Sequence, residues 1–288
     1  IGLASTMATR SVPSIVADGS GGAIVAWWEN RYGNNGLYAS RVTSAGAVPW
    51  TPGGVELRCG VWSLSQDGQA LVSDGAGGAI VTWTEWANSP ARIRAQRVGS
   101  AGAALWTPGG VALPAHSQFD QVQPRLCADG SGGAIVAWLD WGVTEPELFA
   151  HRLDASGVPA WPGSVVIRRD PGAERAAATI PDGVGGTITA WTELTDGQWD
   201  LYAKRVTGSG STLATRVPVC RAAGDQLSPA LAADGSGGAL VTWTDARDGV
   251  GLAIGAQHVD GSGHALWMTD GVILSGQPGW CMRSGIVP

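Results

Sequence analysis

The sequence predicts an all-β fold, a five-bladed β-propeller with four antiparallel strands in each blade. Three observations lead to this prediction. A ten-residue phrase occurs five times along the chain at nearly equal intervals. The 288 residues include 44 glycines and 15 tryptophans, which supply tight turns and large packing anchors. No segment shows the 3.6-residue hydrophobic period of a helix.

The repeated phrase reads DGSGGAIVAW, DGAGGAIVTW, DGSGGAIVAW, DGVGGTITAW and DGSGGALVTW. Its closing tryptophans are Trp27, Trp83, Trp138, Trp191 and Trp243, which lie 56, 55, 53 and 52 residues apart. A fixed period of this length is typical of proteins built from stacked structural repeats. We therefore expect these tryptophans to have structural roles, one in each repeat.

Each repeat is predicted to hold four strands. Strand a is the short run before the aspartate, such as SIVAD, and strand b is GAIVAW. Strand c is the YASRV phrase and strand d the GVELR phrase. Strand b is apolar on both faces, so both faces must be covered, as they are in a blade between two other blades. Four short strands in about 55 residues match the size of a propeller blade.

We expect one domain over residues 1–288, with repeats at about 13–68, 69–123, 124–176, 177–228 and 229–288. Residues 1–12 resemble the segments that precede other repeats and are predicted to close the ring. Closure would remove the unpaired sheet edges that an open stack leaves at its ends. The alternative is that the chain is a piece of a longer array.

The phrase D-G-x-G-G-x-x-x-x-W followed by Y-A-x-R-V resembles a group of bacterial secreted or surface proteins with propeller-like repeats. The resemblance extends from about Pro13 to the end of the chain. It implies an exported, extracellular protein. It implies no shared catalytic role, because such repeats occur in proteins of unrelated function.

Two sets of acids recur in every repeat. The first set is predicted to form the turn between strands a and b, because an aspartate can bond its own backbone and the following glycines accept positive φ; it comprises Asp18, Asp74, Asp129, Asp182 and Asp234. The second set follows each tryptophan by two residues and comprises Glu29, Glu85, Asp140, Glu193 and Asp245. We expect the second set to pair with the strand-c cations Arg41, Arg97, Arg152, Arg205 and His258.

The connections sort into two ends of the blades. The a–b and c–d turns share one end and hardly vary, whereas the b–c and d–a loops share the other end and differ between repeats. Variable loops on a rigid scaffold commonly carry function. The predicted ligand-binding residues on this variable face are Trp86, Trp141, Trp199, Arg31, Tyr32, Arg247, Asp248 and Trp280. The alternative is that these tryptophans cap the blades.

Exposed indole rings beside polar groups suit a sugar, so the sequence favours a non-catalytic, lectin-like binding module that recognises a glycan or a protein. One alternative is a scaffold subunit of a larger extracellular assembly. The other is a glycoside hydrolase, which needs a pair of carboxylates. The predicted a strands read SIVA, ALVS, RLCA, ATIP and ALAA, and carry no carboxylate before the turn aspartate. That composition argues against catalysis and leaves no predicted catalytic residue.

Composition excludes other classes of function. The net charge is −6 and Lys204 is the only lysine, so no basic stripe for nucleic acid exists. No apolar run is long enough for a membrane helix. The four cysteines lie far apart without a CxxC pair, which gives no metal-ligand spacing and no cofactor motif. A disulfide between Cys59 and Cys281 is one expectation, and free or buried thiols are the other.

Overall fold

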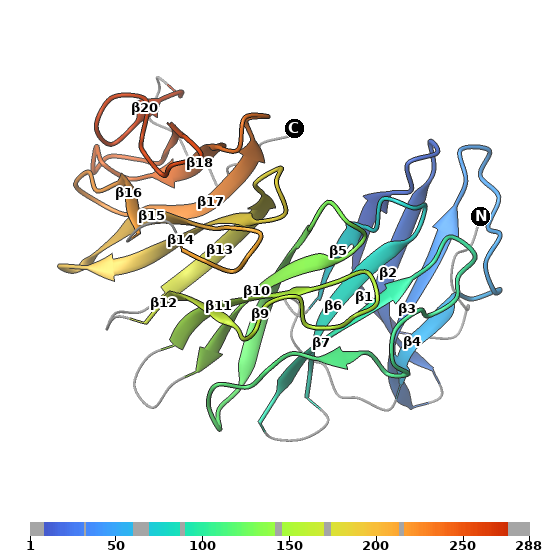
Figure 1. The fold of residues 1–288 in the computed structure, drawn as a ribbon. Helices are drawn as coiled ribbons and strands as arrows, with labels where there is room; N and C mark the ends of the chain where they lie inside the picture. Colours follow the sequence, from blue (N-terminus) through green and yellow to red (C-terminus); the bar gives the residue numbers. More distant parts are fainter. Residues whose placement is uncertain are drawn as a thin grey trace. The chain divides into compact units, whose positions relative to one another are not determined.

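The computed structural model describes residues 9–31, 33–59, 69–86, 90–141, 146–169, 174–212 and 216–275, with backbone alone at 9–12 and 174–176. Every regular element among these residues is a β-strand (Figure 1). The strands form five four-stranded sheets, which we call blades 1 to 5 in chain order.

Blade 1 consists of β1 (Thr9–Ala17), β2 (Ala23–Arg31), β3 (Asn34–Val42) and β4 (Val55–Cys59). Blade 2 consists of β5 (Gln69–Ser73), β6 (Ala79–Glu85), β7 (Arg92–Val98) and β8 (Val111–Ala112). Blade 3 consists of β9 (Gln121–Ala128), β10 (Ala134–Trp141), β11 (Pro146–Leu153) and β12 (Val165–Arg168). Blade 4 consists of β13 (Glu174–Pro181), β14 (Thr187–Thr195), β15 (Gln198–Val206) and β16 (Val217–Cys220). Blade 5 consists of β17 (Gln226–Ala233), β18 (Ala239–Asp245), β19 (Ala253–Val259) and β20 (Val272–Ile273).

Each blade follows chain order from strand a to strand d, and its hydrogen-bonded neighbours are consecutive strands. This confirms the predicted fold class, a five-bladed β-propeller with four antiparallel strands per blade. Residue contacts divide the chain into two compact units, Ile1–Val143 with His151–Gly163 and Thr144–Ala150 with Ser164–Pro288. Closure of the ring and the single domain over 1–288 stay predictions.

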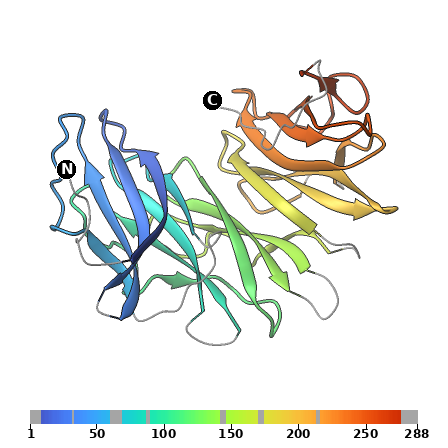
Figure 2. The ribbon, with the colours of Figure 1, turned by 180° about the vertical axis from the view of Figure 1, so that it is seen from behind.

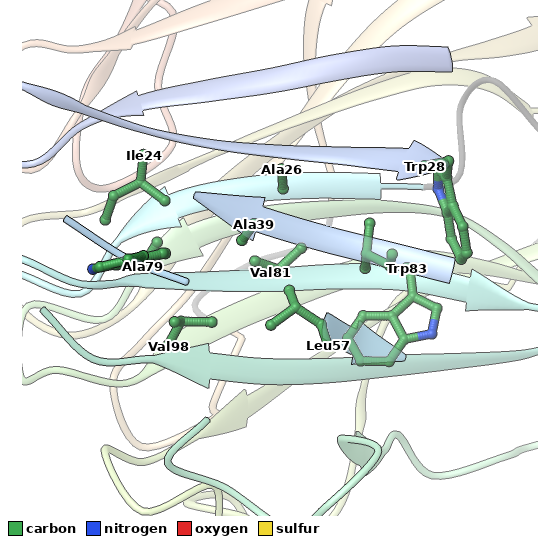
Figure 3. Packing of buried hydrophobic residues seen from close by; sticks show 11 residues of the cluster. Ile24, Ala26, Trp28, Ala39, Leu57, Ala79, Val81, Trp83 and Val98 are labelled. Atoms are coloured by element: carbon green, nitrogen blue, oxygen red, sulfur yellow. The ribbon is translucent and has the colours of Figure 1, made fainter. Parts of the chain in front are cut away.

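The core of each blade is strand b, as the two-sided apolar pattern predicts. All seven residues of β6 are buried, and Trp83 is fully inaccessible to solvent. Figure 3 shows β2 of blade 1 facing β6 of blade 2, with Trp28 and Trp83 at the same end of the two strands. Burial of a large apolar side chain contributes about 1.5–3 kcal/mol. The same packing of one blade on the next is repeated between blades 4 and 5.

The DGxGG turn is held by its aspartate. Oδ1 of Asp18 accepts hydrogen bonds from the backbone N–H groups of Ser20 and Gly22, both at 2.8 Å. A Cβ on Gly22 would lie 2.7 Å from Asp18 Oδ2 and 2.3 Å from the Val42 carbonyl oxygen, so no larger residue fits there. The backbone bond from Ser20, followed by the Arg41 guanidinium, lowers the pKa of Asp18. The figures show the resulting hairpins in all five blades (Figures 1 and 2).

The strand-c cations pair with these turn aspartates, and the predicted pairing with the acids after the tryptophans is wrong. The salt bridges are Arg41–Asp18, Arg97–Asp74, Arg152–Asp129, Arg205–Asp182 and His258–Asp234, at 2.8–2.9 Å. The reason is strand register. Arg41 lies opposite Ile24 at the start of β2, whereas Glu29 lies five residues farther along that strand, about 17 Å away.

The same cations also reach the following blade. Arg97 Nη1 donates to the Ala155 carbonyl at 3.0 Å, and Trp106 Nε1 donates to that same oxygen at 3.0 Å. Trp50 Nε1 likewise donates to the Ser100 carbonyl at 2.9 Å. Arg97 therefore links the a–b turn of blade 2 to the c–d turn of blade 3.

We expect Asp74→Ala to lower the free energy of unfolding by about 2–3 kcal/mol, because it removes two backbone hydrogen bonds and the partner of Arg97. Asp154→Ala is the matched control. Asp154 accepts the same two backbone bonds in a c–d turn, without a cation beside it in the described residues, and its loss should cost about 1 kcal/mol. Urea unfolding of both variants measures the difference. Equal losses would contradict a role for the ion pair.

Candidate functional site

The acids that follow the strand-b tryptophans lie at the variable end of each blade and are all buried. Glu29, Glu85, Asp140, Glu193 and Asp245 are each 1–6% exposed. In three blades the carboxylate accepts the indole N–H of its own tryptophan, at 2.9 Å for Glu29, 3.4 Å for Glu193 and 2.6 Å for Asp245. A buried carboxylate needs such donors, because leaving it unpaired is costly.

Arginines complete most of these sites. Arg31 pairs with Glu29 at 2.7 Å and Arg247 pairs with Asp245 at 2.8 Å. Glu85 is paired with Arg58 and Arg94. In blade 3 Asp140 instead accepts from the Ser117 hydroxyl, the Gln121 amide and the His116 backbone N–H. Four of the five acids are thus explained by partners at the end of strand b. The fifth, Glu193, has similar partners but also has acids opposite it on both neighbouring strands.

Blade 4 places three acids in one cross-strand row, which we call the acidic row. Glu193 on β14 lies opposite Glu174 on β13 and opposite Asp200 on β15. The equivalent neighbours in other blades are Arg10 and Gly36 beside Glu29, Arg92 beside Glu85, Gln121 beside Asp140, and Gln226 and Ala253 beside Asp245. Like charges directly opposite one another destabilise a sheet. A row of acids that breaks the repeat at this cost is a candidate for function.

A tight hairpin fixes the acidic row. Asp196 and Gly197 form the two-residue turn between β14 and β15, and both have positive φ, 52° and 86°. This is the type I′ geometry, for which an Asp-Gly pair is a preferred sequence. A one-residue slip would move Asp200 to the opposite face of the sheet. The turn therefore sets which side chain stands beside Glu193.

Two arginines, Arg168 of blade 3 and Arg216 just before β16, offset the charge of Glu193. Arg168 at the end of β12 lies 3.1 Å from its Oε2, and Arg216 lies 3.3 Å from its Oε1. The Arg168 side chain is only 1% exposed. Arg216 also lies over the Tyr202 ring, with its Cζ 4.7 Å from the ring centroid.

Asp200 is held more loosely. Gln198 Nε2 donates to its Oδ1 at 2.9 Å, the Tyr202 hydroxyl donates to Oδ2 at 3.5 Å, and Arg221 Nε lies 3.5 Å from Oδ2. Arg221 is 54% exposed, although Asp200 itself is 2% exposed. The Arg221 side chain thus contacts this buried acid and also reaches solvent.

Gln226, at the start of β17, leaves an acceptor unused beside this site. It is fully buried, and its Nε2 donates to the Ala222 and Gly224 carbonyls at 3.1 and 2.9 Å. Its Oε1 has no hydrogen-bond partner among the described residues. The equivalent oxygen of Gln121 in blade 3 accepts from Ile93 N at 3.1 Å. Since Gln198 donates to the same Ala222 carbonyl, the unused acceptor lies next to the group that binds Asp200.

The structure distributes the predicted ligand-binding tryptophans over three blades. Trp199 lies in the β14–β15 hairpin beside Asp200, half-buried, and its backbone N–H donates to Asp225 Oδ1 at 3.0 Å. Trp141 ends β10 and is 47% exposed. Trp86 follows β6 and is half-buried. Of the three, only Trp199 belongs to blade 4, and its side chain is on the opposite face of the sheet from Asp200, because successive strand residues alternate.

The remaining predicted residues have varied positions. Arg31 and Arg247 are bound within their own blades by Glu29 and Asp245, and Asp248 is exposed in the loop after β18. Tyr32, Trp280 and Cys281 lie outside the described residues. The predicted Cys59–Cys281 disulfide is therefore not described, although Cys59 is exposed at the end of β4.

Two acids of the row, Glu174 and Asp200, lie before the strand phrases that the sequence repeat predicts. Strand a is longer than predicted and begins at Glu174 in blade 4, so the expectation that no a strand carries a carboxylate before its turn is wrong. Strand c also begins earlier, at Gln198, which brings Asp200 into the sheet. The Asp196–Gly197 pair was the available signal, because Asp-Gly between apolar runs indicates a two-residue hairpin.

Among the described residues no set of three or more His, Cys, Asp and Glu side chains is arranged to hold a metal ion. A search of the same residues finds no helix that could span a membrane.

The chain matches no family model and no curated protein. It is similar in structure to a protein of unknown function from Dyadobacter fermentans DSM 18053, with a TM-score of 0.57, 11% identity and coverage of 93% of this chain and 85% of that one. It is also similar to the polysaccharide lyase Uly1, with a TM-score of 0.58, 7% identity and coverage of 90% and 72%. A weaker match is the α-L-arabinofuranosidase from Lactobacillus brevis, with a TM-score of 0.43, 10% identity and coverage of 96% of both chains.

These matches contradict the predicted function. The better of the two enzyme matches is to a polysaccharide lyase, an enzyme that acts on carbohydrate and not a non-catalytic binding module. The prediction of a non-catalytic, lectin-like module is therefore corrected. At such low identity the similarity itself shows the shared fold.

We expect Arg168→Ala to lower the free energy of unfolding by about 3 kcal/mol, because it removes a buried cation from a buried carboxylate. In an Glu193→Gln background the same substitution should cost at least about 1 kcal/mol less, since the charge it compensates is gone. Urea unfolding of the two single variants and the double variant gives this coupling. Additive effects would show that the pair does not interact.

Proposed function

We propose that this chain is a glycoside hydrolase whose acid–base chemistry is carried by the acidic row of blade 4. The observation that supports it is the row of three acids on adjacent strands, in which Asp200 lies opposite Glu193 at a position where blades 1, 2 and 5 have glycine, arginine and alanine. Hydrolysis of a glycosidic bond by the common route needs two carboxyl groups flanking one bond.

The spacing favours a particular stereochemical course. Directly opposed residues on antiparallel strands have β-carbons about 4.5–5.5 Å apart. Enzymes that retain the anomeric configuration hold their two carboxyl groups about 5–5.5 Å apart, whereas inverting enzymes hold them about 6.5–9.5 Å apart. If the two side chains extend in parallel, their carboxyl groups have the shorter of these separations, so the proposal takes the retaining mechanism.

The contacts of the two acids suggest their roles. Glu193, between the guanidinium groups of Arg168 and Arg216, acts as the charged carboxylate that attacks the anomeric carbon. Asp200, bound by amide and phenol groups, gives a proton to the leaving oxygen and later takes one from water. The unused Gln226 Oε1 accepts a hydrogen bond from a sugar hydroxyl.

The fold contributes a further argument. The likeness to the polysaccharide lyase Uly1 shows that a carbohydrate-active enzyme uses a similar arrangement of strands. A polysaccharide substrate is met outside the cell, so export and membership of the surface repeat proteins are part of this proposal. A protein partner at the variable face stays a prediction.

The test is release of reducing ends from a panel of neutral and acidic polysaccharides. We expect Glu193→Gln and Asp200→Asn each to lower kcat/KM by at least about 100-fold, the usual contribution of a catalytic carboxylate. Products should keep the anomeric configuration of the substrate, which proton NMR detects.

Glu29→Gln is the matched control. Glu29 has the same tryptophan, arginine and tyrosine neighbours, Trp27, Arg31 and Tyr38, but Gly36 stands where Asp200 does. Folding of every variant is checked by circular dichroism. Equal activity in all three variants would contradict the proposal, and products with unsaturated ends would contradict a hydrolytic reaction.

A further inference from the structure

The two arginines on the solvent side of the acidic row have contacts that a substrate can replace. The Arg221 side chain makes one ion pair among the described residues, 3.5 Å to Asp200, and is 54% exposed, while its backbone N–H donates to Asp270 Oδ1 at 2.7 Å. Arg216 lies 3.3 Å from Glu193 and is 31% exposed. Both pairs join a partly exposed guanidinium to a buried carboxylate, so each guanidinium can also contact a ligand from the solvent side.

Access to the acids requires that such a contact be replaced. Glu193 and Asp200 are 3% and 2% exposed, so a glycosidic bond reaches them only when an outer side chain moves aside. Arg168 cannot move freely, because its side chain is 1% exposed. Arg221 is the most exposed of the three and makes the longest ion pair, which identifies it as the group that moves.

A neutral sugar carries no anionic group that could replace the carboxylate as the partner of the guanidinium. A uronic acid does, since its planar carboxylate matches the paired N–H groups of arginine.

We propose that the substrate is an acidic polysaccharide containing uronic acid, and that Arg221 transfers its ion pair from Asp200 to the substrate carboxylate as the sugar enters. This rests on the proposed function of the acidic row. Arg216, stacked on Tyr202, holds Glu193 in place while Arg221 moves. Arg221 is a specificity residue here, because it contacts the substrate without taking part in the proton transfers.

The experiment compares polyuronates (polygalacturonate, alginate and hyaluronan) with the same polymers after chemical reduction of their carboxyl groups. The reduced polymers keep the linkages and lose the charge. We expect wild-type kcat/KM to be at least about tenfold higher on one of the polyuronates than on its reduced form. Arg221→Ala should abolish that preference, and Arg221→Lys should restore it only in part, because lysine cannot bind a carboxylate through two parallel N–H groups.

Arg169→Ala is the control. Arg169 is also an exposed arginine, 60% accessible, but its partner is Glu147 rather than the acidic row. It should leave the preference unchanged. A wild-type enzyme that cleaves the reduced polymers as fast as the polyuronates, or only neutral polysaccharides, overturns the uronate inference and leaves the hydrolase proposal standing.

A binding experiment distinguishes failure of the proposed hydrolysis from failure of the proposed uronate specificity. Oligouronates and their reduced forms are titrated by calorimetry into wild-type and Arg221→Ala protein. Binding of the uronates alone, lost in Arg221→Ala, without cleavage of any polymer supports the specificity assignment and contradicts hydrolysis. No cleavage and no binding of any oligouronate overturns the inference.

Discussion

The interaction on which the fold depends is the turn aspartate, with its two backbone donors and its strand-c cation. In each blade one carboxylate closes the a–b turn through Oδ1 and binds an arginine or histidine through Oδ2. The arginine then reaches the c–d turn of the next blade where both lie within one unit. A single acid therefore sets the hairpin, the position of strand c and the spacing of consecutive blades. The lack of room for a Cβ at Gly22 explains why the glycines accompany it.

This arrangement leaves the opposite end of each blade free to vary. There the buried acids after the tryptophans are satisfied by the indole N–H and by arginines that differ in origin from blade to blade. Blade 1 and blade 4 share the Trp–Glu–Arg–Tyr arrangement, and differ in whether Gly36 or Asp200 stands opposite the glutamate. The chemistry that we propose arises from that single cross-strand difference, on a scaffold that otherwise repeats.

Sequence periodicity was enough to predict the five blades, their four strands and the turn role of Asp18 and its equivalents. It did not predict the residues at which the strands begin and end. The repeated phrases stop at the conserved core of each strand, so Glu174 and Asp200 read as loop residues although they extend β13 and β15. The partner of Arg41 was also missed, because residue spacing does not say which end of a strand a long side chain turns toward. Arg31 and Arg247 read as ligand-binding groups in the sequence, and only their contacts reveal that buried acids bind them.

The central claim is that substrate binds across Glu193 and Asp200. The most direct measurement is a crystal structure of the Asp200→Asn variant with a bound oligosaccharide that the wild-type protein cleaves. The account predicts a glycosidic oxygen within hydrogen-bond distance, about 3 Å, of residue 200, with the neighbouring anomeric carbon facing Glu193. An oligosaccharide bound at another blade, with the acidic row still covered by Arg216 and Arg221, would contradict it.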